Sequence, residues 1–115
     1  MKQTIRVVNL EVGMPTVDQA LRRLSGELYT SRRMGCQAVK LIHGYGSSGK
    51  GGKIRVAIRR ELGGLKLRGQ IKDYIPGEDF SIFNSATLQA FSLAGELRND
   101  KDLDRYNNGV TFVLL

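Results

Sequence analysis

The chain has 115 residues, of which 41% are hydrophobic, and its formal net charge is +7. This length and apolar content predict one domain with a buried core and argue against intrinsic disorder. No run approaches the roughly 18 apolar residues of a membrane span, and the N-terminus lacks the apolar stretch of a signal peptide. A single cysteine, Cys36, leaves no internal disulfide. A cytoplasmic location without a membrane partner is therefore expected.

Charge is unevenly distributed along the chain. Residues 1–76 carry 15 basic and 5 acidic side chains, whereas residues 77–115 carry 3 basic and 6 acidic ones. A basic body with an acidic last third is typical of a protein that meets a polyanion with one face. We therefore expect DNA or RNA as the partner, with an ordinary solvated basic surface as the plainer alternative.

The N-terminal third predicts a strand and a helix. Residues 4–10 are rich in β-branched side chains, which favour a strand. Thr16 is a good N-cap for a helix that runs to about Met34 and stops at Gly35. Apolar residues recur on one face of this helix, and the arginines at positions 22 and 23 fall off it and should be solvated; the apolar row is Val17, Leu21, Leu24 and Leu28.

The middle of the chain predicts a second strand and a second helix. Residues 36–42 are nearly all apolar and predict a strand in the centre of its sheet. The helix is expected from Lys53 to about Leu62, where Gly63 and Gly64 end or weaken it. Its buried row is Ile54, Ile58 and Leu62.

The last third is less regular. Residues 70–75 alternate and predict a third strand, and residues 110–115 predict a final strand in the sheet interior. Between them, Ser85 is a candidate N-cap for a helix to about Arg98 with Leu88, Phe91 and Leu97 inward. The element order predicts an α/β two-layer sandwich. Its sheet of about four mostly parallel or mixed strands has two main helices on one face, with a third helix as an optional addition.

The most informative stretch joins the second strand to the second helix. His43, the only histidine, is followed by a glycine-rich segment with the pattern G-x-x-x-x-G-K-G over residues 44–51. A strand, a glycine-rich turn and a helix N-terminus form an anion site, because backbone N–H groups approach the oxyanion and the helix dipole favours negative charge. The nucleotide-binding P-loop needs Ser or Thr where Gly51 stands, so a nucleotide hydrolase is not expected.

Three segments together resemble the Smr (small MutS-related) domain family. Residues 42–46, Ile-His-Gly-Tyr-Gly, followed by a Gly/Lys-rich tract and Lys-Ile-Arg at 53–55, resemble its HGxG…LR pattern. Residues 10–21 are similar to its LDLHG segment and the helix start that follows, and residues 109–114 to its G-x-T-x-V-x-L final strand. The resemblance covers residues 4–76 and 109–115. Residues 77–108 are an insertion relative to the compact family pattern.

The resemblance implies a DNA- or RNA-binding domain, which in many members is a nicking endonuclease. It also implies a sheet with two helices, like the C-terminal domain of the bacterial initiation factor that monitors start-codon selection. By position, His43, Gly44 and Gly46 match HGxG, Arg55 matches the basic residue of the second helix, and Glu11 stands at the first-motif aspartate.

Two residues are the catalytic candidates. His43 has an ordinary pKa near neutrality and would serve as a general acid or base. Glu11 would orient it, or a water molecule, if the two turns meet at the same sheet edge. However, Gly13 replaces the histidine of LDLHG, so the domain is also consistent with binding without cleavage.

The expected nucleic-acid contacts surround the glycine-rich stretch. Tyr45 either stacks on a base or packs over the loop. The full set of predicted contacts is Gly44, Tyr45, Gly46, Lys50, Lys53, Arg55 and Arg59.

Three functional alternatives stay open at this point. The chain is a nucleic-acid-binding domain, an endonuclease that uses His43, or a non-catalytic module that binds a ribosome or another protein. A divalent metal such as Mg²⁺ is the one cofactor considered, and a monomer is favoured. The sequence does not distinguish DNA from RNA.

Overall fold

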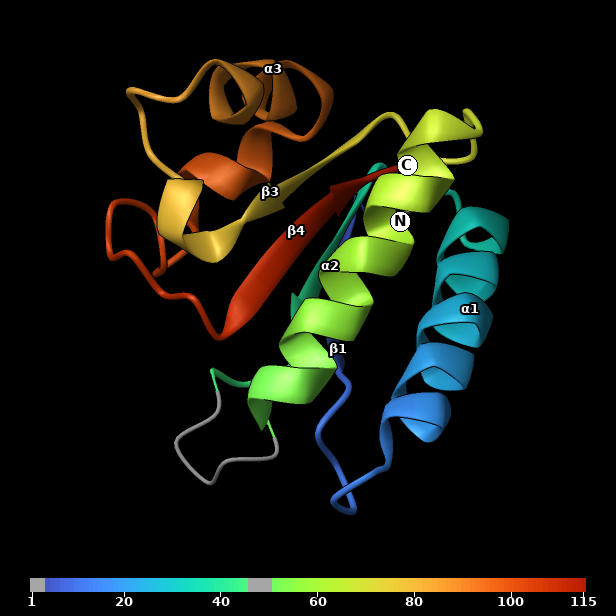
Figure 1. Ribbon diagram of the computed structural model, residues 1–115. Coiled ribbons are helices and arrows are strands. Elements are labelled where there is room, and N and C mark those ends of the chain that lie inside the picture. The colour runs from blue at the N-terminus through green and yellow to red at the C-terminus, as the bar shows by residue number, and fades with distance from the viewer. Residues whose placement is uncertain (1–3, 46–50) are drawn as a thin grey trace.

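Four strands form one mixed sheet in the order β1-β2-β4-β3 in a computed structural model that describes residues 4–45 and 51–115 (Figure 1). β1 and β2 are parallel, and β4 is antiparallel to both β2 and β3. β1, β2 and β3 therefore point the same way, as predicted, and β4 lies between β2 and β3. The strand bounds are Ile5–Asn9 for β1, Ala38–Ile42 for β2, Asp73–Pro76 for β3 and Val110–Leu114 for β4.

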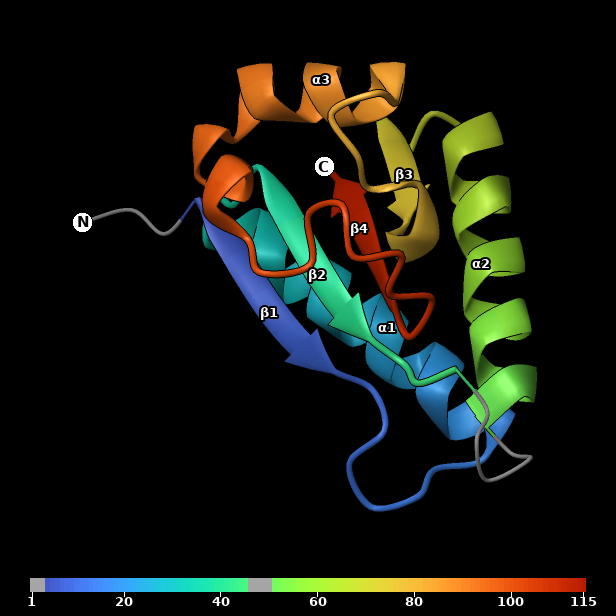
Figure 2. The same cartoon turned by 90° about the vertical axis from the view of Figure 1, so that its left-hand side faces the viewer.

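Helices cover both faces of this sheet. The long helices α1 (Val17–Arg33) and α2 (Gly51–Leu67) lie side by side on one face (Figures 1 and 2). The other face carries α3 (Ser85–Leu93) between two short 3₁₀ helices, η1 (Gly77–Asp79) and η2 (Gly95–Asn99). The predicted α/β sandwich with two main helices on one face is confirmed, and the optional third helix is present.

Helix α1 follows its sequence signals closely. Thr16 and Gln19 form a capping box: the Thr16 hydroxyl accepts from the Gln19 N–H at 3.2 Å, and the Gln19 side chain accepts from the Thr16 N–H at 2.9 Å. The helix ends before Gly35, whose φ of +77° lies in the left-handed region that glycine adopts without a steric clash. Arg22 is exposed, as predicted, whereas Arg23 is only partly exposed, because its guanidinium donates to the carbonyls of Leu10 and Val12.

Helix α2 is longer than predicted, since it continues through Gly63 and Gly64 to Leu67. Each glycine costs a helix about 1 kcal/mol relative to alanine, which weakens but does not end it when the next turn still packs. Leu65 packs against the core formed with α1, so the extra turn gains apolar burial. A methyl group at Gly63 would lie 3.5 Å from the Tyr74 hydroxyl, which is ordinary contact distance.

The core of the second face is aromatic. The Phe80 ring stacks on Phe112 of β4 with 4.0 Å between ring centroids, and it meets Phe91 of α3 edge-on at 6.2 Å. Burial of Phe91 and Leu97 confirms two of the three predicted inward positions. Leu88, the third, is half exposed, so that prediction is wrong.

The bounds of α3 and β3 also differ from the prediction. Asn84, not Ser85, caps α3, because its side-chain oxygen accepts the Thr87 N–H at 2.9 Å. The face of α3 that packs inward consists of Thr87, Ala90 and Phe91, and Leu88 lies off this face. The helix ends at Leu93, and the extended backbone of Ala94 (φ −142°) separates it from η2, so no single helix reaches Arg98. The third strand covers residues 73–76 and not 70–75.

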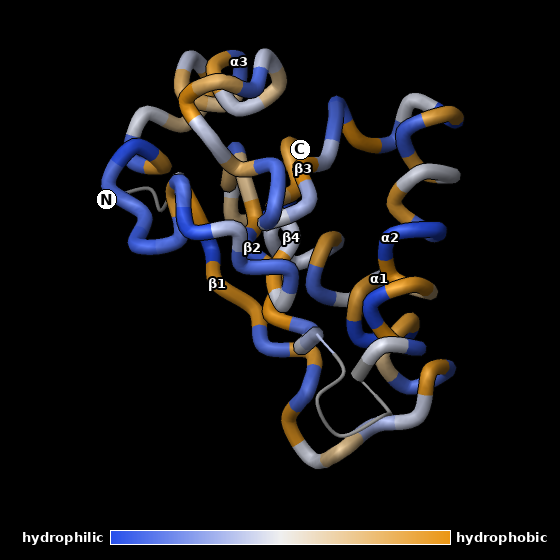
Figure 3. The backbone as a smooth tube through the Cα atoms, turned by 60° about the vertical axis from the view of Figure 1, so that its left-hand side comes forward, coloured by the Kyte–Doolittle hydropathy of each residue, from blue (hydrophilic) through white to orange (hydrophobic). Residues whose placement is uncertain are grey.

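Lys40 is a buried cation in the middle of β2, on the side that faces η2. Its ammonium lies 3.0 Å from Asp100 and 2.6 Å from Asp102. Burial works against the charge, but the hydrogen bonds and charges of the two aspartates outweigh it and raise the pKa of Lys40. This ion cluster joins the segment after η2 to the central sheet. That segment is largely hydrophilic (Figure 3).

Neither the two long helices nor any shorter helix within residues 4–45 and 51–115 combines the length and apolar character needed to cross a membrane.

Candidate functional site

Three turns converge at the end of the sheet where β1 and β2 finish and β4 begins. The Leu10 N–H donates to the Ile42 carbonyl at 2.8 Å, which brings the chain after β1 beside the chain after β2. The N–H groups of His43 and Gly44 both donate to the Gly109 carbonyl at 3.0 Å, which joins the turn before β4. The helices α1 and α2 begin at the same end (Figure 1). In open α/β sheets, ligands bind outside the carboxyl ends of the parallel strands, and β1 and β2 have their carboxyl ends here.

His43 lies inside this edge and is fully buried. Its Nδ1 lies 2.8 Å from the Gly44 carbonyl oxygen, and its Nε2 lies 2.7 Å from the Thr111 hydroxyl. A carbonyl only accepts, so Nδ1 carries the proton and Nε2 accepts from Thr111. In the described conformation both ring nitrogens are therefore engaged within the protein.

The pKa of His43 is lowered to about 4. Burial is the main cause, because it disfavours the charged ring, and the positive charges of Arg59 and Arg55 act in the same direction. The near-neutral pKa expected from the sequence is therefore not what this buried ring has. His43 is a neutral hydrogen-bonding group at pH 7, and its catalytic role stays a prediction.

Arg59 continues the hydrogen-bond chain from Thr111 to Glu78. Its Nε donates to the Thr111 hydroxyl at 3.1 Å, and its two terminal nitrogens donate to the Glu78 carboxylate at 2.8 and 2.7 Å. The carbonyls of Asn108 and Val110 accept further contacts at 3.3 Å. Arg59 thus fixes α2 to η1 and to the start of β4.

The sequence reasoning missed Thr111 and Glu78. Thr111 is the only hydroxyl in an otherwise apolar final strand, and this was the available signal. Glu78 directly follows Pro76-Gly77, which the sequence predicts as the end of a strand. No sequence pattern indicates that Glu78 pairs with Arg59. Arg59 was expected to be a nucleic-acid contact, but the structure places it in this internal network.

Glu11 and Gly44 are neighbours at the surface. The Glu11 carboxylate lies so close to the Gly44 Cα that a methyl group there would be 2.9 Å from its Cδ and Oε2. Gly44 also has a φ of +78°, which side-chain-bearing residues rarely adopt. The condition that the turns of Glu11 and His43 meet at one sheet edge is fulfilled, although the Glu11 side chain is exposed and the His43 ring is buried.

Tyr45 is largely exposed and rests on the turn before β4. A methyl group at Gly109 would lie 3.0 Å from the Tyr45 ring and 3.1 Å from the Asn107 side-chain oxygen. One part of the ring therefore packs on the turn before β4, a contact that the sequence did not predict, and 59% of the residue stays accessible. Stacking of Tyr45 on a base stays a prediction.

The predicted cations of α2 differ in accessibility. Lys53 is exposed and lines a shallow pocket with Ile54 and with the turn before α1, residues 14–17. Arg55 is half-buried on the side of His43, and Arg60 is exposed. Gly46 and Lys50, which the sequence places in the same site, lie outside the described residues.

The candidate cofactor finds no support in the arrangement of side chains. Within residues 4–45 and 51–115, no group of three or more histidine, cysteine, aspartate or glutamate side chains is placed to hold a metal ion.

Comparison with known proteins gives no match: no family model matches the chain, and no curated protein and no solved structure resembles it at a significant level.

Proposed function

We propose that the domain binds nucleic acid through the phosphate backbone at the edge where the three turns converge, as the resemblance to the Smr family implies. The carrying observation is the group of cations on the first turns of α2 at this edge, where the acidic groups are Glu11 beside Gly44 and Glu78 paired with Arg59. No acidic residue occurs in the sequence between Glu27 and Glu61, and this interval includes the glycine-rich stretch and the first three turns of α2. Exposed Lys53 and Arg60 and half-buried Arg55 project from those turns.

The chemistry of such a site is electrostatic. A helix N-terminus favours negative charge, and each lysine or arginine that neutralises a phosphate releases condensed counterions. Affinity should therefore fall with salt and depend little on base sequence. We assign Arg59 a positioning role, because its donors already bind Glu78 and Thr111.

A binding assay at two salt concentrations tests the proposal. Lys53→Ala/Arg55→Ala should weaken binding of a fluorescent oligonucleotide and reduce the slope of log affinity against log salt by about 1.4 to 1.8, for two lost phosphate contacts. The matched control is Arg33→Ala/Lys72→Ala, which removes the same charge at the other end of the sheet. Equal effects of the two double variants, or an affinity that salt does not change, would contradict the proposal.

Phosphodiester cleavage is the second candidate, favoured by the exposed Glu11 carboxylate beside Gly44. Glu11 would activate or orient a water molecule next to a phosphate held at the loop. His43 takes part only if its ring leaves Thr111. Nicking of supercoiled plasmid and of structured RNA, with and without Mg²⁺, should then be lost in Glu11→Gln while binding is retained. Cleavage that persists in purified Glu11→Gln argues against this candidate.

A further inference from the structure

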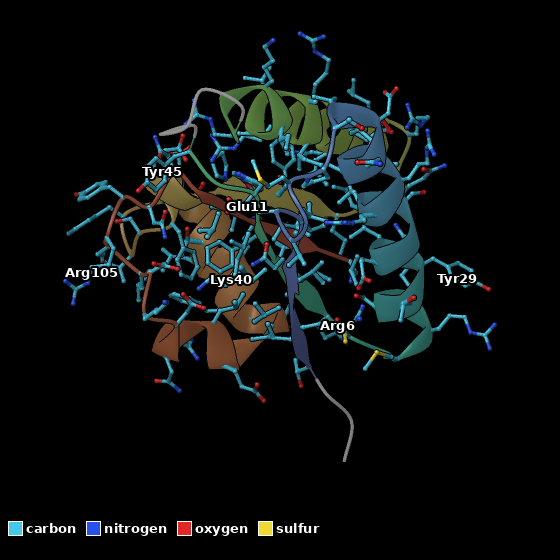
Figure 4. All side chains as sticks on the ribbon, turned by 90° about the horizontal axis from the view of Figure 1, so that it is seen from below. Arg6, Glu11, Tyr29, Lys40, Tyr45 and Arg105 are labelled. Atoms are coloured by element: carbon cyan, nitrogen blue, oxygen red, sulfur yellow. The ribbon has the colours of Figure 1, made fainter. Side chains whose placement is uncertain are left out.

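The turn that precedes β4 contacts Tyr45 at Gly109 and also carries an exposed aromatic ring and an exposed cation. Tyr106 is 72% exposed, and the neighbouring Arg105 is also exposed. Tyr45 rests on Gly109, which lies three residues beyond Tyr106 on the same turn. Figure 4 shows Tyr45 and Arg105 projecting from the same side of the molecule, opposite to Tyr29.

The backbone of this turn holds Tyr106 outward at a conformational cost. Tyr106 has a φ of +55° and Asp104 a φ of +60°, in the left-handed region that bulky residues avoid. Burial of the side chain does not offset this cost, because the Tyr106 ring is exposed. Its conformation therefore gains nothing from the core.

The same turn is fixed from several directions. The Asp104 N–H donates to the Phe80 carbonyl at 2.9 Å, and the Arg105 N–H donates to the Asp102 carbonyl at 3.1 Å. The Asn107 amide donates to the Asp102 carboxylate at 3.0 Å and its oxygen accepts the Gly109 N–H at 2.9 Å. Asp102 in turn pairs with buried Lys40. The backbone that carries the exposed ring is thus preorganised, which lowers the entropy that this turn loses when a partner binds.

The exposed aromatic rings of this surface favour single-stranded over double-stranded nucleic acid. Exposed aromatic rings bind unpaired bases by stacking, whereas bases in a duplex already stack on each other. Arg105 adds a cation near the rings, and the acidic neighbours are exposed Asp104 on the turn and Glu11 beside Gly44. Phosphate attraction therefore comes mainly from α2, and the turn supplies stacking.

We propose that the partner is single-stranded nucleic acid, whose backbone follows the start of α2 while bases stack on Tyr45 and Tyr106. This inference rests on the proposed function, because it presupposes that α2 attracts phosphates. It adds the class of strand and two residues, Arg105 and Tyr106, that the sequence did not single out.

Fluorescence anisotropy with an unstructured oligothymidine and an oligouridine of about 12 nucleotides, and with a duplex of equal length, tests the inference. Tyr45→Ala and Tyr106→Asn should each weaken single-strand binding about tenfold, and Tyr106→Phe should bind like the unchanged protein. Asparagine tolerates the positive φ, so the turn keeps its backbone. Tyr29→Ala, which removes an equally exposed tyrosine from α1, should have no effect.

The outcomes separate the two proposals. Tighter binding of the duplex than of either single strand, or unchanged single-strand affinity in Tyr106→Asn, would overturn the inference and leave phosphate binding at α2 intact. No salt-dependent binding of any of the three probes to the unchanged protein would overturn both.

Discussion

The Arg59 guanidinium donates two hydrogen bonds to the Glu78 carboxylate and so joins α2 to the 3₁₀ turn that follows β3. Burial alone would raise the pKa of Glu78, but the hydrogen bonds and charge of Arg59 outweigh it and hold that pKa below its usual value. The same arginine reaches Thr111 and, through it, the His43 ring.

Removing this arginine should destabilise the fold more than removing the carboxylate charge. Arg59→Ala leaves buried acceptors on Thr111 and β4 unsatisfied, and should lower the free energy of unfolding by about 2 kcal/mol. Glu78→Gln keeps one acceptor and should cost about 1 kcal/mol. Urea unfolding measures both. Arg60→Ala, one position along α2 and exposed, is the control; a loss as large as that of Arg59→Ala would contradict the network.

The buried neutral His43 should make stability depend on pH. Its pKa is about 4 in the folded protein, against 6.5 for an ordinary histidine. Below about pH 6.5 the unfolded chain takes up a proton that the folded chain does not, so stability should fall as pH drops toward 4. The slope should reach about 1 kcal/mol per pH unit and level off below pH 4.

His43→Gln identifies the source of this slope, because glutamine does not titrate. Urea unfolding of both proteins between about pH 7 and pH 4.5 should give a steeper pH dependence for the unchanged chain. Parallel curves would show that the His43 ring takes up its proton as readily in the folded chain as in the unfolded chain, contrary to its lowered pKa.

Lys40 should tolerate no single replacement by an apolar residue. Lys40→Met leaves Asp100 and Asp102 without their buried cation and should cost about 3–5 kcal/mol. Adding Asp100→Asn and Asp102→Asn to Lys40→Met should recover much of the loss, since no uncompensated charge then remains. Thermal unfolding of the two variants measures the difference, and an equally unstable triple variant would count against this explanation.

Two glycines should respond in opposite directions to the same substitution. A methyl group at Gly77 would overlap the Asn107 carbonyl oxygen and lie 2.6 Å from a Val110 methyl. Gly77→Ala should therefore lower the free energy of unfolding by about 2 kcal/mol or more, as overpacking substitutions do. Gly26 lies in α1 with open space around it, and Gly26→Ala should gain about 0.5–1 kcal/mol from helix propensity. Chemical unfolding should therefore rank Gly26→Ala above the unchanged protein and Gly77→Ala below it.

Local patterns were sufficient for much of the fold. The capping box at Thr16, the apolar run of β2 and the apolar final strand are contained within a few residues each, so periodicity and capping rules located them. The end of α2 does not follow from local pattern. The two glycines weaken the helix, and the packing of Leu65 that offsets them is visible only in the folded structure.

The inner part of the candidate site could not be derived in this way. β2 pairs with β4 in a register that sets Leu41 opposite Thr111, and this pairing brings His43 to Thr111 across 68 positions of sequence. Arg59 and Glu78 likewise meet only because α2 crosses the sheet toward η1. The sequence predicted which residue types gather near the glycine-rich stretch, but their division into internal and exposed groups depends on this tertiary pairing.

The position of β4 has a consequence for the order in which the chain acquires its structure during synthesis. β3 has only β4 as a neighbour in the sheet, and β4 is the last strand in the chain. While a ribosome makes the protein, β1, α1 and β2 can associate early, but β3, η1 and the ring of Phe80 must wait for Val110–Leu114 to emerge. The nascent chain therefore exposes one edge of β2 until Val110–Leu114 have emerged, and a ribosome-bound fragment that stops before Val110 should bind chaperones that a fragment with β4 outside the ribosome does not.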